Sequence, residues 1–444
     1  MFEIYVDAEV QSRFDRLMKK IIAIAERGFT ILSLIFYSSG PLPLILSGGA
    51  GQGDELNPVS TDYSILQSMF FVSYLIVALL VVFQWKKALY ALKKNWTISL
   101  LMVVALASAI WTFIPGQTLV RSIALVGTSL FGLYLAIRYP LQEQLRLLGW
   151  SFVVIIIMSF LFAIAIPTFG MMPGGVHAGA WRGIYVHKNV MGKVMVVGAI
   201  VFWVLATNPK EKSWLTWIDW IGFGLSFGLV LLSKSSSSMI NFITIFALVP
   251  IYHALSWRYY LMVPTLITTI AVGGGLSLWF SANAATLLDG IGKDATLTGR
   301  ADMWPYIIEM IEKHPWLGYG YNGFWGDADA PAAYVWSAAK WMPPNSHNGF
   351  LDLWLELGLL GVIIFAIGFG QTLLRTLVWI RTNKARESLW FLLYLTNLGL
   401  SNLSESSLLN RNDLFWLLYV SASFSLVMTA TKTTKMPIHS EILN

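Results

Sequence analysis

The feature that most constrains this chain is a series of apolar runs, each about 20 residues long, separated by short polar segments. A run of that length is what an α-helix needs to cross a bilayer. The composition agrees, because 56% of the residues are hydrophobic and only 12% are charged, against about 25% charged in an average soluble domain. A chain with so little charge could not cover a water-facing surface, which excludes a soluble enzyme and a nucleic-acid-binding protein. The sequence therefore predicts an all-α polytopic membrane protein.

The hydropathy pattern predicts about twelve transmembrane helices. The expected spans are 28–46, 62–84, 97–114, 120–138, 148–167, 189–207, 215–232, 238–255, 259–281, 349–371, 388–404 and 413–430. Nine helices thus occupy 28–281 and three occupy 349–430, with one long polar loop over 282–348 and a tail over 431–444. Before them, residues 1–27 mix basic and apolar side chains without a signal-peptide cleavage site, so 8–27 is expected to form an amphipathic helix on the membrane surface.

The distribution of basic residues fixes the expected orientation. With the N-terminus in the cytoplasm, 20 of the 30 Lys and Arg residues fall in cytoplasmic segments, as the positive-inside rule requires. Both termini are then cytoplasmic, and the 282–348 loop faces the outside. The outward basic residues are Arg121, Arg182, Lys188, Lys193, Lys234, Lys293, Arg300, Lys313, Lys340 and Arg411.

Several of these outward cations stand in polar motifs at helix ends. Arg182 precedes Gly183, and Arg300 follows Gly299. Arg and Lys converging at a membrane surface suit a pyrophosphate, since Arg binds phosphate oxygens in bidentate fashion and Lys adds a point charge. The alternative is that each side chain extends to lipid headgroup phosphates.

His347 is the candidate general base. It lies between Ser346 and Asn348 at the mouth of the tenth span, and an imidazole is the usual proton acceptor near neutral pH. Asp352 and Glu356 follow four residues apart, on one helix face. The alternative is a helix-capping histidine with structural carboxylates.

A metal or cofactor is not expected. The chain has no Cys and no Walker or His-Glu-x-x-His motif. Asp327 and Asp329 could be interpreted as a pair of metal-binding carboxylates, but such pairs are common in polar loops.

Five motifs together resemble the bacterial O-antigen ligase and polymerase superfamily, specifically its exopolysaccharide-production polymerase-like branch. They are GIYVHKN at 183–189, LSKS at 232–235, LTGRADMW at 297–304, PWLGYG at 315–320 and SHNGFL at 346–351. The resemblance implies a GT-C-like glycosyltransferase of the inner membrane that takes glycans from undecaprenyl pyrophosphate on the periplasmic side.

The resemblance also implies roles for individual residues. Arg182 and Arg300 would bind the pyrophosphate, and His347 would serve the acceptor hydroxyl. The expected substrate-binding residues are His187, Lys188, Asn189, Lys234, Ser235, Asn348 and Arg411. Family members often carry an Arg soon after the Ser motif, where this chain has Ser236, Ser237 and Ser238, so the role of Lys234 is the open one.

The predicted reaction inverts the anomeric carbon and needs no metal, because the cations stabilise the charge that develops on the leaving pyrophosphate. The expected partners are the lipid-linked glycan, a glycan or lipid acceptor, and membrane lipids, with no nucleic acid. Two alternatives remain: a ligase that attaches the glycan to lipid A core, and a transporter or flippase for the same lipids. A transporter would place broken helices near the bilayer midplane in two related halves, whereas these motifs gather at the outer face in the second half of the chain.

Overall fold

The structure is a computed structural model. It describes residues 8–49, 64–174, 177–208, 213–255, 257–258, 260–265, 267–268, 300–325, 330–340, 342–383 and 386–434, and within these all side chains except those of 8–12, 213, 300–302, 386 and 430–434.

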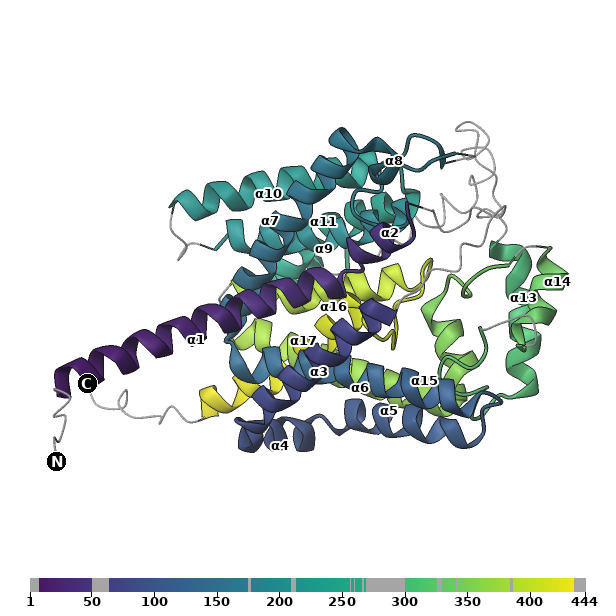
Figure 1. The fold of residues 1–444 in the computed structure, drawn as a ribbon, viewed down its shortest axis with the longest axis horizontal. Helices are drawn as coiled ribbons and strands as arrows, with labels where there is room; N and C mark the ends of the chain where they lie inside the picture. The colour runs from purple at the N-terminus through teal and green to yellow at the C-terminus, as the bar shows by residue number, and fades with distance from the viewer. Residues whose placement is uncertain are drawn as a thin grey trace, which may run out of the picture.

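The chain is all-α, as predicted, and the described helices form one elongated bundle (Figure 1). The first half of the chain contributes α1 (Ala8–Tyr37), α2 (Leu42–Leu46), α3 (Ser64–Val82), α4 (Trp85–Lys94), α5 (Trp96–Ala107), η1 (Ser108–Ile110), α6 (Pro115–Arg138), α7 (Leu141–Ala165), α8 (Pro167–Gly170) and α9 (Lys188–Ala206). The second half contributes α10 (Ser213–Leu232), α11 (Ser236–Ala254), α13 (Arg300–Lys313), α14 (Ala332–Ala339), α15 (Gly349–Thr382), η3 (Arg386–Ser388), α16 (Leu389–Ser401) and α17 (Leu414–Thr434).

Two helices form the centre of the bundle. The apolar window of α9 is 78% buried, and α9 packs against α7, α10, α11 and α16. Helix α17 is buried along nearly its whole length and packs mainly against α6. By contrast only 22% of the apolar window of α3 is buried, so most of its Leu, Ile, Val and Phe side chains face outward. In a membrane protein such a surface is solvated by lipid.

The spans follow the predicted positions, with local differences in length. Within the described residues, seven helices are long and apolar enough to cross a membrane, or eight if the bent pair α4–α5 is one span. Helices α16 and α17 are shorter apolar helices at predicted spans. The predicted ninth span, 259–281, lies largely outside the described residues.

Helix α1 continues through the boundary expected between a surface segment and the first span. It is one helix from Ala8 to Tyr37, and its buried residues begin at Thr30. Glu26 accepts bonds of 2.7 and 2.8 Å from the guanidinium of Arg138 at the end of α6. The turns of α1 that precede Glu26 have exposed side chains and extend beyond the bundle (Figure 1).

Helix α15 has a sharp kink at Gly358, whose φ of 64° lies in the left-handed region. The kink is where the 315–320 motif packs. The amides of Tyr319 and Gly320 donate to the carbonyl oxygens of Leu355 and Glu356 at 2.8 and 2.9 Å, which satisfies two acceptors that the interrupted helix leaves open. The motif thereby connects the outer loop to α15.

The ends of the described chain lie at one end of the bundle, and α13 and α14 lie at the other (Figure 1). In Figure 1 the start of α1, helix α4 and the end of α17 are on the left, and α13 and α14 form a cap on the right. The cap has its own small core, in which Met303 and Ile307 of α13 pack with Val335 of α14. The candidate site residues lie at the cap side of the bundle.

Candidate functional site

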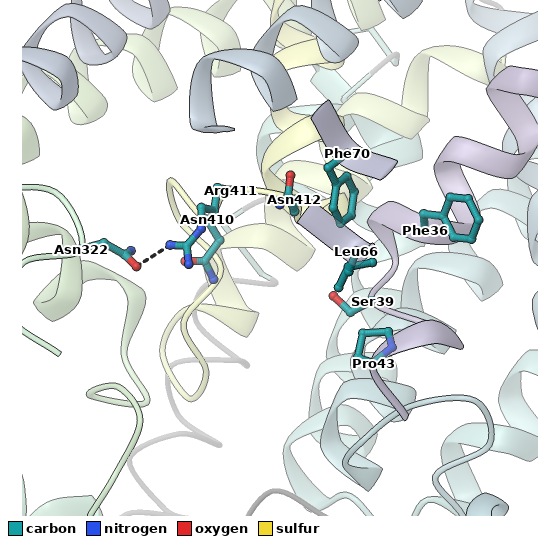
Figure 2. Close-up of a pocket in the computed structure, with 9 residues that line it drawn as sticks. All are labelled: Phe36, Ser39, Pro43, Leu66, Phe70, Asn322, Asn410, Arg411 and Asn412. Carbon is teal, nitrogen blue, oxygen red and sulfur yellow. Dashed lines mark hydrogen bonds between the residues drawn. The ribbon is translucent and has the colours of Figure 1, made fainter. Parts of the chain in front are cut away.

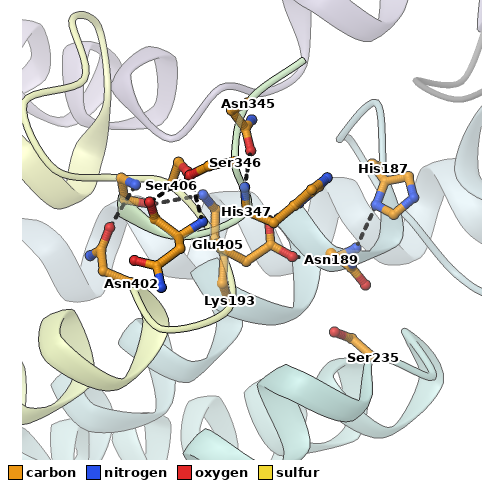
Figure 3. Close-up of polar contacts among 12 residues, drawn as sticks. His187, Asn189, Lys193, Ser235, Asn345, Ser346, His347, Asn402, Glu405 and Ser406 are labelled. Carbon is orange, nitrogen blue, oxygen red and sulfur yellow. Dashed lines mark hydrogen bonds and ion pairs between the residues drawn. The ribbon is translucent and has the colours of Figure 1, made fainter. Parts of the chain in front are cut away.

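His347 stands at the start of α15 in a loop whose main chain is held by its neighbours (Figure 3). The side-chain oxygen of Asn348 accepts the amides of Phe350 and Leu351 at 3.0 and 3.3 Å, so Asn348, and not His347, is the N-cap of α15. His347 itself has a φ of 52°, which is uncommon for a residue with a side chain. Its amide donates to the side chain of Asn345 at 2.9 Å. These bonds fix the direction of the imidazole.

Asp352 connects this loop to two other segments. Its carboxylate accepts the amide of Ser346 at 3.1 Å and the indole N–H of Trp325 at 2.8 Å, and it also accepts the hydroxyl of Ser406. The side chain is buried. Asp352 therefore supports the His347 loop from below, and the contacts assign it a structural part near the site.

Glu405, in the loop between α16 and α17, contacts His347 directly. Its Oε2 lies 3.8 Å from Nδ1 of His347, and its Oε1 accepts the side-chain amide of Asn189 at 3.3 Å. The side chains of Glu405 and His347 are 17% and 18% exposed. A carboxylate, an imidazole and an amide thus meet at one partly buried point (Figure 3).

His187 caps α9 as a neutral imidazole. Its Nδ1 accepts the amide of Asn189 at 3.1 Å, the bond of an N-cap residue. Burial lowers the pKa of His187 to about 4, so the ring is uncharged at neutral pH. A neutral histidine whose Nδ1 already accepts a bond can offer a phosphate only its other ring nitrogen.

Lys188 and the Ser motif meet beside this cap. The Nζ of Lys188 donates to the carbonyl oxygen of Lys234 at 3.1 Å, and Lys234 has a φ of 49° in the turn between α10 and α11. The turn packs closely on α9, because a Cβ at Gly192 would overlap Ser238. Ser235 and Ser238 bond to each other through their hydroxyls at 3.0 Å.

Lys193, one turn further along α9, reaches the α16–α17 loop. Its Nζ donates to the hydroxyl of Ser407 at 3.0 Å, two residues after Glu405. Lys188 and Lys193 of α9 therefore place two cationic side chains at the turn before α11 and at the α16–α17 loop, and this loop also carries the carboxylate of Glu405.

Arg182 is fully buried and binds main-chain carbonyls. Its guanidinium donates to Phe169 at 2.7 Å, Thr168 at 3.1 Å, Val186 at 3.4 Å and Gly49 at 2.5 Å. These contacts join the end of α2, the α7–α8 junction and the turn before α9. A pyrophosphate could bind this guanidinium only in place of some of these carbonyls, and the role predicted for Arg182 stays a prediction.

Arg300 is the first residue of α13, and its side chain lies outside the described ones. Trp304, one turn later, donates from its indole to the carbonyl oxygen of Ser346 at 3.0 Å. The first turn of α13 is thus attached to the His347 loop, and the backbone of Arg300 lies within a turn of that attachment.

Arg411 lies in a separate cavity of about 430 Å³ (Figure 2). One wall is apolar and consists of Phe36, Pro43, Leu66 and Phe70 from the α1–α3 region. Ser39 lies beside Pro43 and Leu66 on this side, and the opposite wall is polar and consists of Asn322, Asn410, Arg411 and Asn412. The guanidinium of Arg411 donates to the side-chain oxygen of Asn322 at 2.5 Å, across the gap between the α16–α17 loop and the outer loop. Both sites use the α16–α17 loop, with Glu405 at one and Arg411 at the other.

The predicted site residues therefore divide into groups. His347, Asn348, His187, Lys188, Asn189, Lys234 and Ser235 lie around the ends of α9, α10, α11 and α15. Arg182 lies in the turn before α9 but binds main-chain carbonyls, and Arg411 lines the separate cavity. Sequence reasoning missed Glu405 and the contact of Lys193 with the α16–α17 loop. Glu405 is 58 residues from His347, and the only signal in the sequence was a carboxylate in a polar loop at the outer end of a span.

No three His, Asp or Glu side chains come together to hold a metal ion in the part of the chain that the structure describes. Asp327 and Asp329 fall outside that part, so the prediction about this pair stays a prediction.

Comparison with known proteins shows a similarity over part of the chain. A family model described as O-antigen ligase matches residues 221–366, which include Lys234, Ser235, Arg300, His347 and Asn348. The chain is also 25% identical over 199 residues to the exopolysaccharide production protein ExoQ of Rhizobium meliloti (strain 1021).

That alignment covers 42% of this chain and 44% of the relative, so the chain matches less than half of the relative's length. Glu405 and Arg411 lie beyond the residues matched by the family model. Together these matches confirm the resemblance drawn from the motifs: this is a polytopic all-α membrane protein whose residues 221–366 match the O-antigen ligase family model.

Proposed function

We propose that the protein is a membrane glycosyltransferase that polymerises an oligosaccharide linked to undecaprenyl pyrophosphate, at the outer face of the inner membrane. The observation that carries the proposal is the position of His347. Its imidazole lies beside Glu405, and two lysines of α9 reach the neighbouring loops, Lys188 the turn before α11 and Lys193 the α16–α17 loop. This arrangement provides a proton acceptor next to a cationic surface, which is what glycosyl transfer from a pyrophosphate requires.

The reaction assigns a task to each group. An acceptor hydroxyl loses its proton to Nε2 of His347, and its oxygen attacks the anomeric carbon from the face opposite the pyrophosphate. The bond between that carbon and the phosphate oxygen breaks, and undecaprenyl pyrophosphate leaves with the electron pair. Lys188, Lys193, Lys234 and Arg300 stabilise the charge on the leaving group, so the chemistry needs no metal. One displacement inverts the configuration.

The Arg411 cavity is assigned to the second substrate. Its apolar wall fits an isoprenoid chain or a sugar face, and Arg411 with three Asn side chains fits phosphate oxygens or sugar hydroxyls. Its volume of about 430 Å³ lies within the range of ligand pockets. Two amphipathic sites connected by one loop favour transfer between two lipid-linked glycans, and therefore a polymerase.

The test is the glycan made by a deletion strain that carries the wild-type gene, His347→Ala or His253→Ala. His253 lies in the last turn of α11, at the end away from Ser236, and serves as the matched control. The proposal predicts long polymer with the wild type and with His253→Ala, and single repeat units that accumulate on the lipid with His347→Ala. Loss of polymer from lipid A alone would instead indicate the ligase. Loss of lipid-linked units from the outer leaflet, with the polymerising step intact, would indicate the flippase.

A further inference from the structure

The structure of the α16–α17 loop assigns Glu405 a part in the reaction. We propose that Glu405 is the positioning residue for His347: its carboxylate faces Nδ1, keeps the proton on that nitrogen and leaves Nε2 to receive the proton of the acceptor hydroxyl. This inference rests on the proposed function, and it names a group that the family match does not reach, because the matched residues end at 366.

The first support is the pair of contacts that the carboxylate makes. One oxygen lies 3.8 Å from Nδ1 of His347, and the other accepts the amide of Asn189 at 3.3 Å. The Asn189 bond holds one oxygen, which leaves the other directed at the imidazole. At 17% exposure, the carboxylate is shielded from most of the water that would weaken this interaction.

The second support is that the main chains beneath the two side chains are locked together. The amide of Gly349 donates to the carbonyl oxygens of Asn402 at 2.9 Å and of Glu405 at 3.2 Å. A Cβ at Gly349 would overlap the side-chain oxygen of Asn402, so the loop and the start of α15 approach as closely as glycine allows. Asn402 in turn accepts the amides of Ser407 and Leu408 at 2.8 and 3.1 Å. The separation of Glu405 from His347 is therefore set by the backbone.

The third support is the conformation of His347. A φ of 52° is costly for a histidine and persists where the surroundings enforce it. Here the amide of His347 donates to Asn345, and Nδ1 of the same residue lies 3.8 Å from Glu405. A residue in an unfavourable backbone conformation, with its imidazole beside a carboxylate, is what we expect at a site under functional constraint.

The chemical consequence is the assignment of the two ring nitrogens. A carboxylate beside Nδ1 favours the tautomer with hydrogen on that nitrogen, and it also stabilises the imidazolium that forms when Nε2 takes a proton. A glutamine at 405 would keep the shape and could still accept the Asn189 amide, but it would lose the charge. A purely structural Glu405 would tolerate that change.

The experiment compares Glu405→Gln, Glu405→Asp and Glu309→Gln in purified protein. Glu309 is an exposed carboxylate on α13 that pairs with Lys313 at 3.1 Å, and it serves as the control. Three quantities are measured: kcat and KM with the lipid-linked oligosaccharide of the producing bacterium, binding of undecaprenyl pyrophosphate, and the ¹⁵N NMR shifts of His347 in protein with labelled histidine.

We expect kcat of Glu405→Gln to fall by about 10²-fold, with KM and undecaprenyl pyrophosphate binding within about twofold of wild type. Glu405→Asp should recover part of kcat, and Glu309→Gln should match wild type. The ¹⁵N shifts should show hydrogen on Nδ1 in wild type and a mixture of tautomers in Glu405→Gln. Wild-type kcat in Glu405→Gln, or an unchanged tautomer, would overturn the inference. The NMR measurement tests the positioning role of Glu405 even if the wild-type protein makes no polymer. Absence of polymer with wild-type protein would refute only the proposed function.

Discussion

The buried guanidinium of Arg182 shows how one side chain can hold together segments that are distant in the sequence. It binds four carbonyl oxygens that belong to three different segments. A lysine would keep the charge but, with one nitrogen, could not reach all four.

We therefore expect Arg182→Lys to lower the free energy of unfolding by about 2–4 kcal/mol, since each carbonyl left unsatisfied costs about 1–3 kcal/mol. Thermal unfolding in detergent measures the change, and the folded fraction should still bind undecaprenyl pyrophosphate. If Arg182→Lys had normal stability but no longer bound undecaprenyl pyrophosphate, the result would support the prediction that Arg182 is a phosphate ligand.

His187 gives the stability of the protein a pH dependence with a defined sign. Its pKa is lowered to about 4 by burial, against 6.5 for an ordinary histidine. Between these pH values the unfolded chain binds a proton that the folded chain does not. The contribution of His187 to the free energy of unfolding is therefore fully present above pH 6.5 and declines as the pH falls toward 4. The loss contributed by this one residue should reach up to about 3 kcal/mol.

The comparison variant is His187→Asn, which can still cap α9 but does not titrate. The slope of unfolding free energy against pH should be shallower in this variant between pH 4 and 6.5. Equal slopes in the two proteins would show that the imidazole is not held neutral.

At the scale of elements, the kink in α15 connects the outer loop to the bundle. Gly358 has a φ of 64°, and a Cβ there would overlap the backbone of Trp316. Gly358→Ala should thus lower the free energy of unfolding by about 3 kcal/mol, from left-handed strain plus overpacking.

Gly370 offers the matched control in the same helix, because a Cβ there meets nothing within 4 Å. Gly370→Ala should leave stability unchanged or raise it by about 0.5–1 kcal/mol, since alanine favours the helix. The two variants are compared by unfolding in detergent. Similar stability of the two would mean that the kink is not enforced by glycine.

The sequence predicted the elements better than their connections. Hydropathy placed the spans because each needs only its own apolar run, as in α6 and α9. It did not predict that α1 is continuous from Ala8 to Tyr37, because hydropathy changes along this helix while its backbone conformation does not. The motif residues near His347 were found, but the contact of Glu405 was not, because hydrogen bonds between distant loops leave no periodic pattern. The carbonyl partners of Arg182 could not be predicted either, because they are main-chain atoms, which any sequence provides.

At the scale of the whole molecule, the two ends of the bundle are expected to face opposite sides of the membrane. The chain has no cysteine, so single introduced cysteines can be labelled without background. Ser337 of α14 and Lys93 of α4 are both exposed and lie at opposite ends of the bundle, so they are the positions for labelling. A membrane-impermeant maleimide should label Ser337→Cys in cells with a permeable outer envelope, and Lys93→Cys only after the inner membrane is opened. Labelling of Lys93→Cys alone in intact cells would invert the topology.

The central claim is that this molecule joins lipid-linked repeat units by itself. The most direct measurement is mass spectrometry of the products formed when purified wild-type protein in lipid nanodiscs receives the lipid-linked oligosaccharide in excess EDTA. We expect a ladder of glycans that grow by whole repeat units. One undecaprenyl pyrophosphate should be released per unit added, and the new linkage should be inverted at the anomeric carbon. Lipid-linked oligosaccharide that remains unchanged in EDTA but reacts after Mg²⁺ or Mn²⁺ is added would contradict the metal-free mechanism. Substrate that never changes with folded protein would contradict the claim itself.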